Sequence, residues 1–237
     1  MATLVFDIET SALPLEQFDS AQQEYLFRDL QKLEGPARDS RRAEVCQQLS
    51  LWPFTAEIVC IAMLNADSSR GQVLFTARDW ESIDDDGPVE FVALADEIEL
   101  LTAFWDVARR YDSIVTFNGR GFDVPFVYLR SALLNVPISR KDWLGYRFQT
   151  DPHCDLAEQL TFYGISGRDG AARRFNLDFY CKAFGVASPK SGGVTGLDIN
   201  RLRLTGQYRE IAEYCLRDVQ ATVLLYQIWR TRLAGIK

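Results

Sequence analysis

The chain has little of the residue chemistry that builds zinc sites or disulfide frameworks. It contains one histidine and five cysteines in 237 residues. The cysteine number is odd, the spacing is irregular, and no Cys-x-x-Cys pair occurs. We therefore expect buried free thiols and neither a zinc ribbon nor a disulfide scaffold. The cysteines are Cys46, Cys60, Cys154, Cys181 and Cys215.

Long apolar runs and an excess of basic charge are also missing. No apolar run approaches the roughly 18 residues of a membrane-spanning helix, and no basic leader precedes Asp7. We expect a cytoplasmic protein with no membrane partner. A net charge of −7 disfavours tight binding to long duplex DNA, because phosphate contacts supply most of that affinity. It leaves room for an enzyme that holds a few terminal nucleotides through a local basic patch.

The overall composition is typical of a globular protein, with 47% hydrophobic and 25% charged residues. The length allows one substantial core, so we expect a single domain over 1–237. Residues 15–50 predict a helical insertion, broken at Gly35-Pro36. The arginines of this insertion either line a strand-entry channel or form a solvated helix face; they are Arg28, Arg38, Arg41 and Arg42.

Periodicity predicts strands mostly early in the chain and helices later. The predicted strands cover 4–8, 58–64, 72–76, 113–117 and, as a short fifth, 146–149. The predicted helices begin after Asp96, which forms a capping box with Glu99, and then cover 124–134, 155–162, 177–184 and 208–232. This order predicts an α/β fold with a mixed five-stranded sheet, in which three antiparallel strands are followed by parallel ones and helices flank the sheet.

The first acidic motif, Asp7-Ile8-Glu9, lies at the end of the first predicted strand. Alternate side chains of a strand share a face, so Asp7 and Glu9 project together while Phe6 and Ile8 point into the opposite layer. Two such carboxylates can bridge a pair of divalent ions. Taken alone, the tripeptide is more typical of a charged strand end that faces water.

The second motif runs from Asn118 to Asp123, directly after the fourth predicted strand, where loops of α/β sheets carry function. Asn118 can bond a phosphate or ribose, and Gly119 and Gly121 permit close backbone approach. Phe122 offers a ring to a base, and Asp123 adds a third carboxylate. The alternative is an ordinary Asn-Gly turn with Asp123 as a helix N-cap.

The third motif pairs Tyr214 with Asp218, which share a helix face because they are four residues apart. An acid and a neutral phenol on one face can hold a metal and orient its attacking water. The alternative is a packed tyrosine, with Asp218 paired with Arg217 or another basic group. The three motifs occur in order on a predicted strand, a post-strand loop and a late helix, and this combination favours a two-metal phosphodiesterase site over the separate alternatives.

Together the motifs resemble the 3′-5′ exonucleases of the ribonuclease H-like fold that have four acidic ligands, in the subtype with tyrosine in the third motif. The form Asn-x-x-x-Phe-Asp is most similar to the proofreading domain of family B DNA polymerases and its stand-alone bacterial relatives. The resemblance spans residues 4 to about 226, and we expect a free-standing exonuclease.

The resemblance implies a residue set and a reaction. Two divalent ions, Mg²⁺ or Mn²⁺, would be ligated by Asp7, Glu9, Asp123 and Asp218. Tyr214 would position the attacking water, and the candidate substrate contacts are Thr10, Asn118, Phe122 and Lys190. The expected partner is the 3′ end of single-stranded nucleic acid, with DNA favoured over RNA and nucleoside 5′-monophosphates as products. The alternatives are a catalytically silent nucleic-acid-binding domain and an endonuclease on the same scaffold.

Five further residues have two interpretations each. His153 lies outside the third motif and is expected to be structural or at the surface. Asp155 either supports the site or caps a helix. Leu13, Phe122 and Phe126 are candidate wedges at the strand end, although such residues more often belong to a core.

Overall fold

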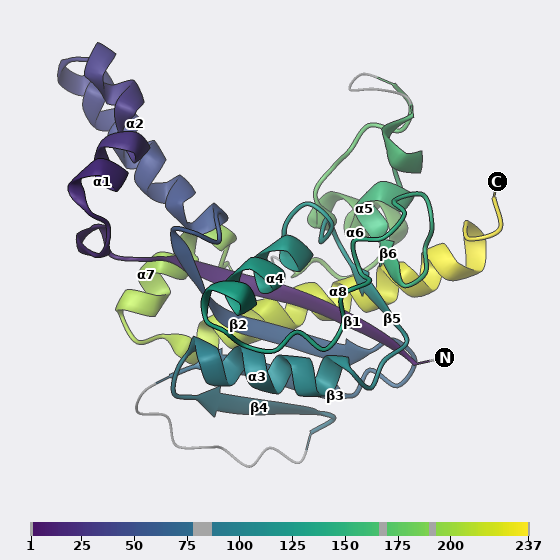
Figure 1. Ribbon diagram of the computed structural model, residues 1–237. Coiled ribbons are helices and arrows are strands. Elements are labelled where there is room, and N and C mark those ends of the chain that lie inside the picture. The colour runs from purple at the N-terminus through teal and green to yellow at the C-terminus, as the bar shows by residue number, and fades with distance from the viewer. Residues whose placement is uncertain (1, 78–86, 166–169, 190–192, 237) are drawn as a thin grey trace.

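The computed structural model describes residues 2–77, 87–165, 170–189 and 193–236. Within these residues a mixed sheet of six strands forms the centre, in the order β4-β3-β2-β1-β5-β6 (Figure 1). The strands are β1 (Thr3–Ala12), β2 (Ala56–Asn65), β3 (Gly71–Thr76), β4 (Val89–Leu94), β5 (Ser113–Thr116) and β6 (His153–Asp155). The predicted α/β class with a mixed, helix-flanked sheet is confirmed.

The predicted number of five strands is wrong. β4 was not predicted, and it pairs in parallel with β3. Residues 146–149 form turns, and the exposed rings of Tyr146 and Phe148 pack against each other with centroids 5.6 Å apart. The place beside β5 is taken by β6, a few residues later. The alternating aromatic pattern therefore reflects surface ring packing, which resembles a strand pattern in sequence.

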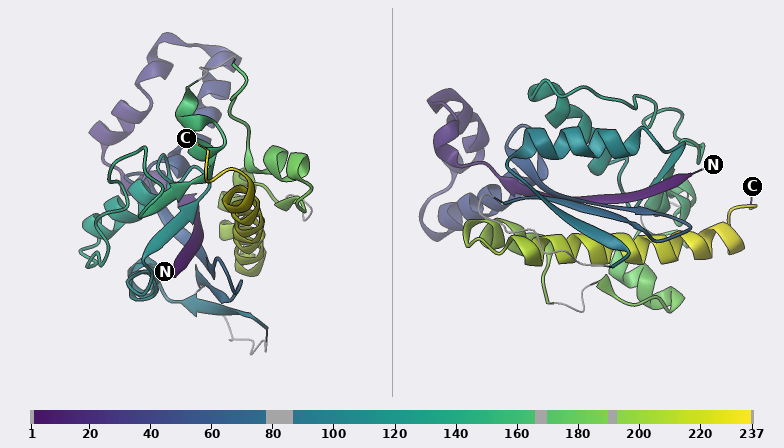
Figure 2. Two further views of the ribbon diagram at one scale, coloured as in Figure 1. Left: turned by 90° about the vertical axis from the view of Figure 1, so that its right-hand side faces the viewer. Right: turned by 90° about the horizontal axis from the view of Figure 1, so that it is seen from below.

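The helices cover both faces of the sheet (Figure 2). Leu4, Phe6 and Ile8 of β1 join a core with residues of α3 and α4, whereas Val5 joins the core that contains α8. The predicted alternation along β1 is thus confirmed. The helices are α1 (Ser20–Leu26), α2 (Gly35–Gln48), α3 (Glu97–Ala108), α4 (Asp123–Leu133), α5 (Leu156–Gln159), α6 (Leu177–Phe184), α7 (Ile199–Leu204) and α8 (Tyr208–Arg232).

The start of α3 shows half of the predicted capping box. The Asp96 carboxylate accepts a hydrogen bond from the Glu99 backbone N–H at 3.0 Å. The Glu99 carboxylate, however, accepts from the N–H of Ala95 at 3.0 Å and so reaches one residue further back than predicted. The helix end is still satisfied from both sides, because each carboxylate takes one backbone donor.

Strand β1 and its neighbour β2 shift register between Glu9 and Thr10. At this irregularity the backbone N–H of Ile58 donates to the Glu97 carboxylate at 2.8 Å. Arg130 completes the arrangement with two hydrogen bonds to the same carboxylate, at 2.9 and 2.5 Å. The pair joins α3, α4 and β2, so the sheet is held at the point where β1 carries its acidic residues.

The segment 15–50 forms an arm of α1, α2 and short 3-10 turns that projects from the end of β1 (Figure 1). The predicted break at Gly35-Pro36 is where α2 begins. Arg41 pairs with Asp29 at 3.5 Å and with Glu44 at 2.7 Å. Its neighbours stack on rings of the arm itself, Arg28 on Tyr25 and Arg42 on Phe27. These contacts match the solvated-face interpretation of the arginines. No helix in the described part of the chain is long and apolar enough to span a membrane.

Candidate active site

The first acidic pair lies in the middle of the sheet, on the face that α8 covers. Asp7 and Glu9 alternate with Phe6 and Ile8 and so share the side of Val5. Glu9 is 8% exposed. In the register of β1 with β2, Cys60 stands directly opposite Glu9. The Glu9 side chain is therefore buried and that of Asp7 half-buried between the sheet and α8.

The second motif folds back from β5 toward β1. Gly119 is required in this loop, because a Cβ there would lie 2.3 Å from the Thr116 hydroxyl oxygen. Asn118 has a φ of 71°, a left-handed conformation that asparagine tolerates better than most residues. Asp123 begins α4, and its carboxylate accepts a hydrogen bond from the Ile8 backbone N–H at 3.1 Å. This bond places the third carboxylate against β1. In the N-cap alternative, the carboxylate would instead have bonded the first backbone N–H groups of the helix.

The third motif comes from α8, which packs along β1 and β2. Tyr214 is 8% exposed and Cys215 is fully buried. The Cys215 thiol donates to the Asp7 backbone carbonyl at 3.5 Å. Asp218, one turn after Tyr214, acts on the carboxylates of Asp7 and Glu9 through its charge. The helix thus adds a fourth carboxylate and a phenol to the acidic pair of β1.

The electrostatics of the site are those of crowded, buried carboxylates. Burial first, and then the negative charges of the other acids, raise the pKa of Asp7 and Glu9 well above the usual range. Burial also raises the pKa of Asp123 to about 7, although its bond from the Ile8 N–H acts in the opposite direction. Burial and the surrounding acids raise the pKa of the Tyr214 hydroxyl, so this phenol stays protonated at neutral pH.

These donors suit hard divalent cations. Asp7, Glu9 and Cys215 bring ligand atoms within 4.8 Å of one another. Carboxylate oxygens are the ligands that Mg²⁺ and Mn²⁺ prefer. The pKa of the Cys215 thiol is raised well above its usual range by burial, so it stays protonated and serves as a hydrogen-bond donor. The crowded negative charge is costly unless cations neutralise it, which is the reason that the acidic set fits a metal site.

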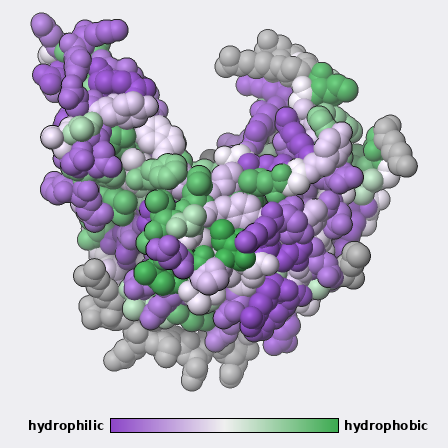
Figure 3. Space-filling view, viewed as in Figure 1, coloured by the Kyte–Doolittle hydropathy of each residue, from purple (hydrophilic) through white to green (hydrophobic). Residues whose placement is uncertain are grey.

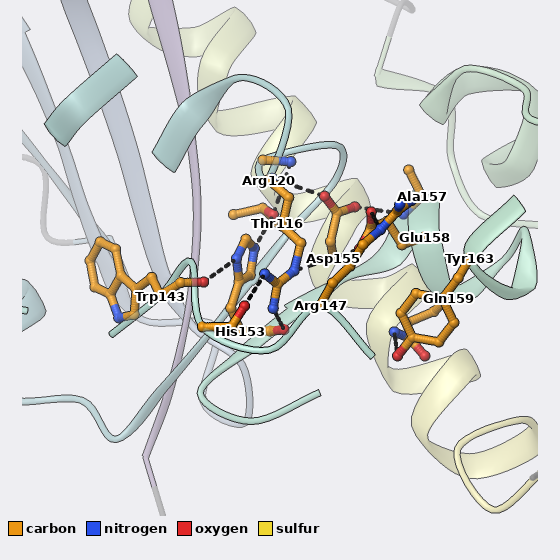
Figure 4. Close-up of polar contacts among 12 residues, drawn as sticks. Thr116, Arg120, Trp143, Arg147, His153, Asp155, Ala157, Glu158, Gln159 and Tyr163 are labelled. Atoms are coloured by element: carbon orange, nitrogen blue, oxygen red, sulfur yellow. Dashed lines mark hydrogen bonds and ion pairs between the residues drawn. The ribbon is translucent and has the colours of Figure 1, made fainter. Parts of the chain in front are cut away.

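A second layer of residues holds the Asn118–Asp123 loop (Figure 4). The Asp155 carboxylate accepts from the backbone N–H groups of Asn118 and Arg120, each at 2.9 Å, and also caps α5 through Ala157 at 3.0 Å. Asp155 therefore caps α5, as one interpretation predicted, and it also holds the loop of the second motif. No local pattern predicts the two loop contacts, since they join residues 37 and 35 positions apart.

His153 is fully buried and belongs to the same support. Its Nδ1 lies 3.2 Å from the Trp143 carbonyl, which can only accept, so Nδ1 carries the proton. Its Nε2 then accepts from the Thr116 hydroxyl at 2.7 Å, and that hydroxyl accepts from the Gly119 N–H at 3.1 Å. Burial lowers the pKa of His153 to about 3, which keeps the ring neutral. Of its two expected locations, the structural one is found.

An open cavity of about 610 Å³ is lined by Glu9, one of the four candidate acids. Glu9, Phe122 and Tyr214 line one side, and α2 with the turn after it lines another. Figure 3 shows the surface hollowed between the arm and the lobe that carries α5 and α6. Thr10 also lines this cavity, with its hydroxyl bonded to the Ser50 carbonyl at 2.6 Å. The arm therefore forms a wall of the candidate site.

The other candidate contacts are distributed differently. Lys190 lies outside the described residues. Phe126 is 1% exposed and belongs to the core, whereas Phe122 is half-buried and reaches the cavity. Leu13 is half-buried at the end of β1. The Asn118 side-chain oxygen accepts a hydrogen bond from Arg174, a residue that belongs to none of the three motifs.

Comparisons with known proteins identify a family that includes most of the chain. The family model described as "Predicted 3'-5' exonuclease related to the exonuclease domain of PolB" matches residues 55–234. "DNA polymerase 1" of Saccharolobus solfataricus is 26% identical over 206 residues, which are 81% of this chain and 21% of that protein. "DNA polymerase 1" of Sulfolobus acidocaldarius is 28% identical over 181 residues, 71% of this chain and 19% of that protein. The chain thus spans about a fifth of the length of these relatives.

Among solved structures, the family B DNA polymerase from the hyperthermophilic archaeon Pyrobaculum calidifontis matches with a TM-score of 0.57 and 19% identity. The match covers 97% of this chain and 24% of that one, and it shows a shared fold. The residues that match the family model begin after Asp7 and Glu9. The position of this first acidic pair in the site comes from the structure itself.

Proposed function

Because the chain belongs to the family of predicted 3′-5′ exonucleases related to the exonuclease domain of PolB, we propose that it removes nucleotides from the 3′ end of single-stranded DNA. The products are nucleoside 5′-monophosphates, and the cofactors are two Mg²⁺ or Mn²⁺ ions. One observation carries the proposal: carboxylates from β1, the start of α4 and α8 meet at one buried place beside an open cavity.

Four residues would hold the ions, namely Asp7, Glu9, Asp123 and Asp218. When bound, two such ions supply a hydroxide at neutral pH and stabilise the departing 3′ oxygen. The chain keeps Tyr214 protonated beside these carboxylates, so its hydroxyl does not act as a base and instead positions the attacking water through a hydrogen bond. The hydrogen bond from the Ile8 N–H fixes the Asp123 carboxylate in place. Positioning and charge neutralisation are then the main work of the protein.

The cavity suits a single strand more than a duplex. Phe122 lines it next to Glu9 and offers a ring face to the terminal base. Residues of the arm also line this cavity, and they narrow the approach to Glu9. DNA is the proposed substrate because the curated relatives are named DNA polymerases. Thr10 and Asn118 remain proposed substrate contacts, at the edge of the cavity and in the neighbouring loop.

The test is a digestion of 5′-labelled single-stranded DNA and RNA of matched sequence, with Mg²⁺, with Mn²⁺ and with EDTA. A metal-dependent ladder that shortens from the 3′ end is expected, with DNA cut faster. An oligonucleotide with a blocked 3′ end should resist digestion, and continued cutting would instead indicate an endonuclease. No cleavage of any substrate would favour the silent binding domain.

The variants Asp7→Ala and Asp218→Ala should lose cleavage while keeping the native circular dichroism spectrum. Asp106→Ala is the matched control, because this exposed acid on α3 pairs only locally with Arg109 at 3.3 Å. The control should retain full activity. Normal turnover in either Asp7→Ala or Asp218→Ala would remove that residue from the site.

A further inference from the structure

Two further cavities open on the other side of the Asn118–Asp123 loop. One has a volume of about 350 Å³ and the other about 440 Å³, and they share Arg147, Glu158 and Arg174 as lining residues. We call the two together the arginine groove. Arg120 lines the first cavity and Arg173 the second. Four guanidinium groups therefore gather in one place on a chain whose net charge is −7.

The charges of the groove are not balanced among the residues that the structure describes. Glu158 pairs with Arg147 at 2.6 Å and with Arg120 at 3.5 Å, so one carboxylate serves two guanidinium groups. Asp155 directs its carboxylate to backbone N–H groups (Figure 4). Arg174 bonds a neutral side chain, that of Asn118, and Arg173 stacks over the Phe175 ring. With four positive and two negative side chains, the described lining carries an excess of positive charge.

The geometry of the guanidinium groups suits a chain of phosphates. Arg147, Arg173 and Arg174 are exposed at the surface, so an incoming anion can reach them without opening the core. Planar guanidinium groups bind phosphate oxygens in pairs and are more weakly hydrated than lysine ammonium groups. The local basic patch that a short nucleic-acid grip requires is therefore present on this acidic protein.

The loop connects the groove to the acidic site. Phe122 lines the cavity that contains Glu9 and Tyr214, whereas its neighbour Gly121 lines the arginine groove. The loop is thus a ridge with the carboxylates on one side and the arginines on the other. A strand whose terminal phosphodiester bond lies at the carboxylates reaches the groove by crossing this ridge.

We propose that the arginine groove binds backbone phosphates of the substrate strand on the 5′ side of the bond that is cut. This inference rests on the proposed exonuclease function, because that function sets the direction of the strand. The groove supplies affinity that does not depend on base sequence, since phosphate contacts carry no sequence information. Arg147 and Arg174 are shared by both cavities and are the central contacts.

The test measures binding of a 5′-fluorescein-labelled oligothymidylate 20-mer by anisotropy in EDTA, where no metal-dependent cleavage occurs. For a single strand, each phosphate contact contributes about 0.7 to the magnitude of the slope of log affinity against log salt concentration. Relative to 1 M salt, this corresponds to about a fivefold gain in affinity per contact at 0.1 M salt. The variant Arg147→Gln/Arg174→Gln should therefore bind about 25-fold more weakly, with a slope smaller by about 1.4. The matched control is Arg70→Gln/Arg109→Gln, which removes two exposed arginines elsewhere and should bind like wild type.

The variant Glu158→Gln should change the DNA-binding affinity in the opposite direction. This change keeps a hydrogen-bonding side chain but removes the carboxylate that neutralises Arg120 and Arg147. Binding should then tighten by about fivefold, the effect of about one added contact. A purely structural role of the cluster predicts weaker binding for both variants, so tightening in Glu158→Gln separates the two explanations.

The outcomes also separate this inference from the proposed function. If wild type digests DNA from the 3′ end and Arg147→Gln/Arg174→Gln binds normally, the groove proposal is overturned and the exonuclease proposal stands. If wild type digests nothing while the double variant still loses binding, the exonuclease proposal fails and the groove stands as a phosphate-binding site. Weaker binding by Glu158→Gln also overturns the groove proposal.

Discussion

Replacing Asp123 by asparagine should stabilise the metal-free protein. The side chain is 2% exposed, and burial raises its pKa from 3.8 to about 7. Asparagine keeps an oxygen that accepts the hydrogen bond from the Ile8 N–H but removes the buried charge. Each pKa unit is a tenfold change in an equilibrium, so a shift of about three units corresponds to at most about 4 kcal/mol in the free energy of unfolding.

The sign of the pH dependence follows from the raised pKa. Below pH 3.8 the Asp123 carboxyl is protonated in both the folded and the unfolded state, so it does not lower the free energy of unfolding. As the pH rises toward 7 the unfolded state ionises first, and the wild-type protein loses stability relative to Asp123→Asn. The advantage of the variant should therefore be small at pH 4, grow up to about pH 7 and stay constant above it.

The assay is urea unfolding in EDTA at several pH values, for wild type, Asp123→Asn and the surface control Asp106→Asn. Added Mn²⁺ should narrow the difference, because a cation at a hundredfold excess over its dissociation constant stabilises the wild type by about 3 kcal/mol. The asparagine variant should gain much less. Equal stability of wild type and variant in EDTA at pH 8, or a difference that does not change between pH 4 and 8, would refute the reasoning.

Three other perturbations test single contacts. Tyr214→Phe should lower kcat by roughly 10² to 10³, which is the usual effect of losing one positioned hydrogen bond. KM should change little. An unchanged kcat in steady-state kinetics would refute this prediction. Gly119→Ala should destabilise the protein by roughly 1 to 3 kcal/mol, because the new methyl group meets the Thr116 side chain at 2.3 Å; an unchanged urea midpoint would contradict the clash. The pKa of His153 is lowered to about 3. Its contribution to the free energy of unfolding is therefore complete above pH 6.5 and is lost as the pH falls toward 3. The stability difference between wild type and His153→Gln should therefore shrink between pH 7 and 5, and a constant difference in urea unfolding would argue against a buried neutral ring.

Much of the site was accessible from sequence because its parts follow local periodicity. The shared face of Asp7 and Glu9 depends only on the two-residue repeat of a strand. Tyr214 and Asp218 fall one turn apart in a helix whose bounds, Tyr208–Arg232, are those predicted. Such patterns can be recognised without knowing which elements are neighbours in space.

The remainder depended on sheet order, which the sequence does not display. β4 and β6 could not be placed, because short edge strands are defined by their partners more than by their own residues. Residues 146–149 also show that local sequence patterns are ambiguous. Aromatic residues at alternate positions are found in strands, but here the same alternation belongs to rings that pack against each other at the surface.

The sequence by itself determined which side chains are candidates for the proposed chemistry: carboxylates on a strand, in a post-strand loop and on a helix, with a tyrosine one turn before the last of them. Only the tertiary structure decided that they meet. The hydrogen bond from Ile8 to Asp123 spans 115 residues. It forms because β5 runs parallel to β1 and pairs with it as far as Val5, so the chain that leaves β5 at this edge of the sheet reaches Ile8. The arginine groove has the same origin, because Arg120 and Arg174 are brought together by the packing around that edge and share no local pattern.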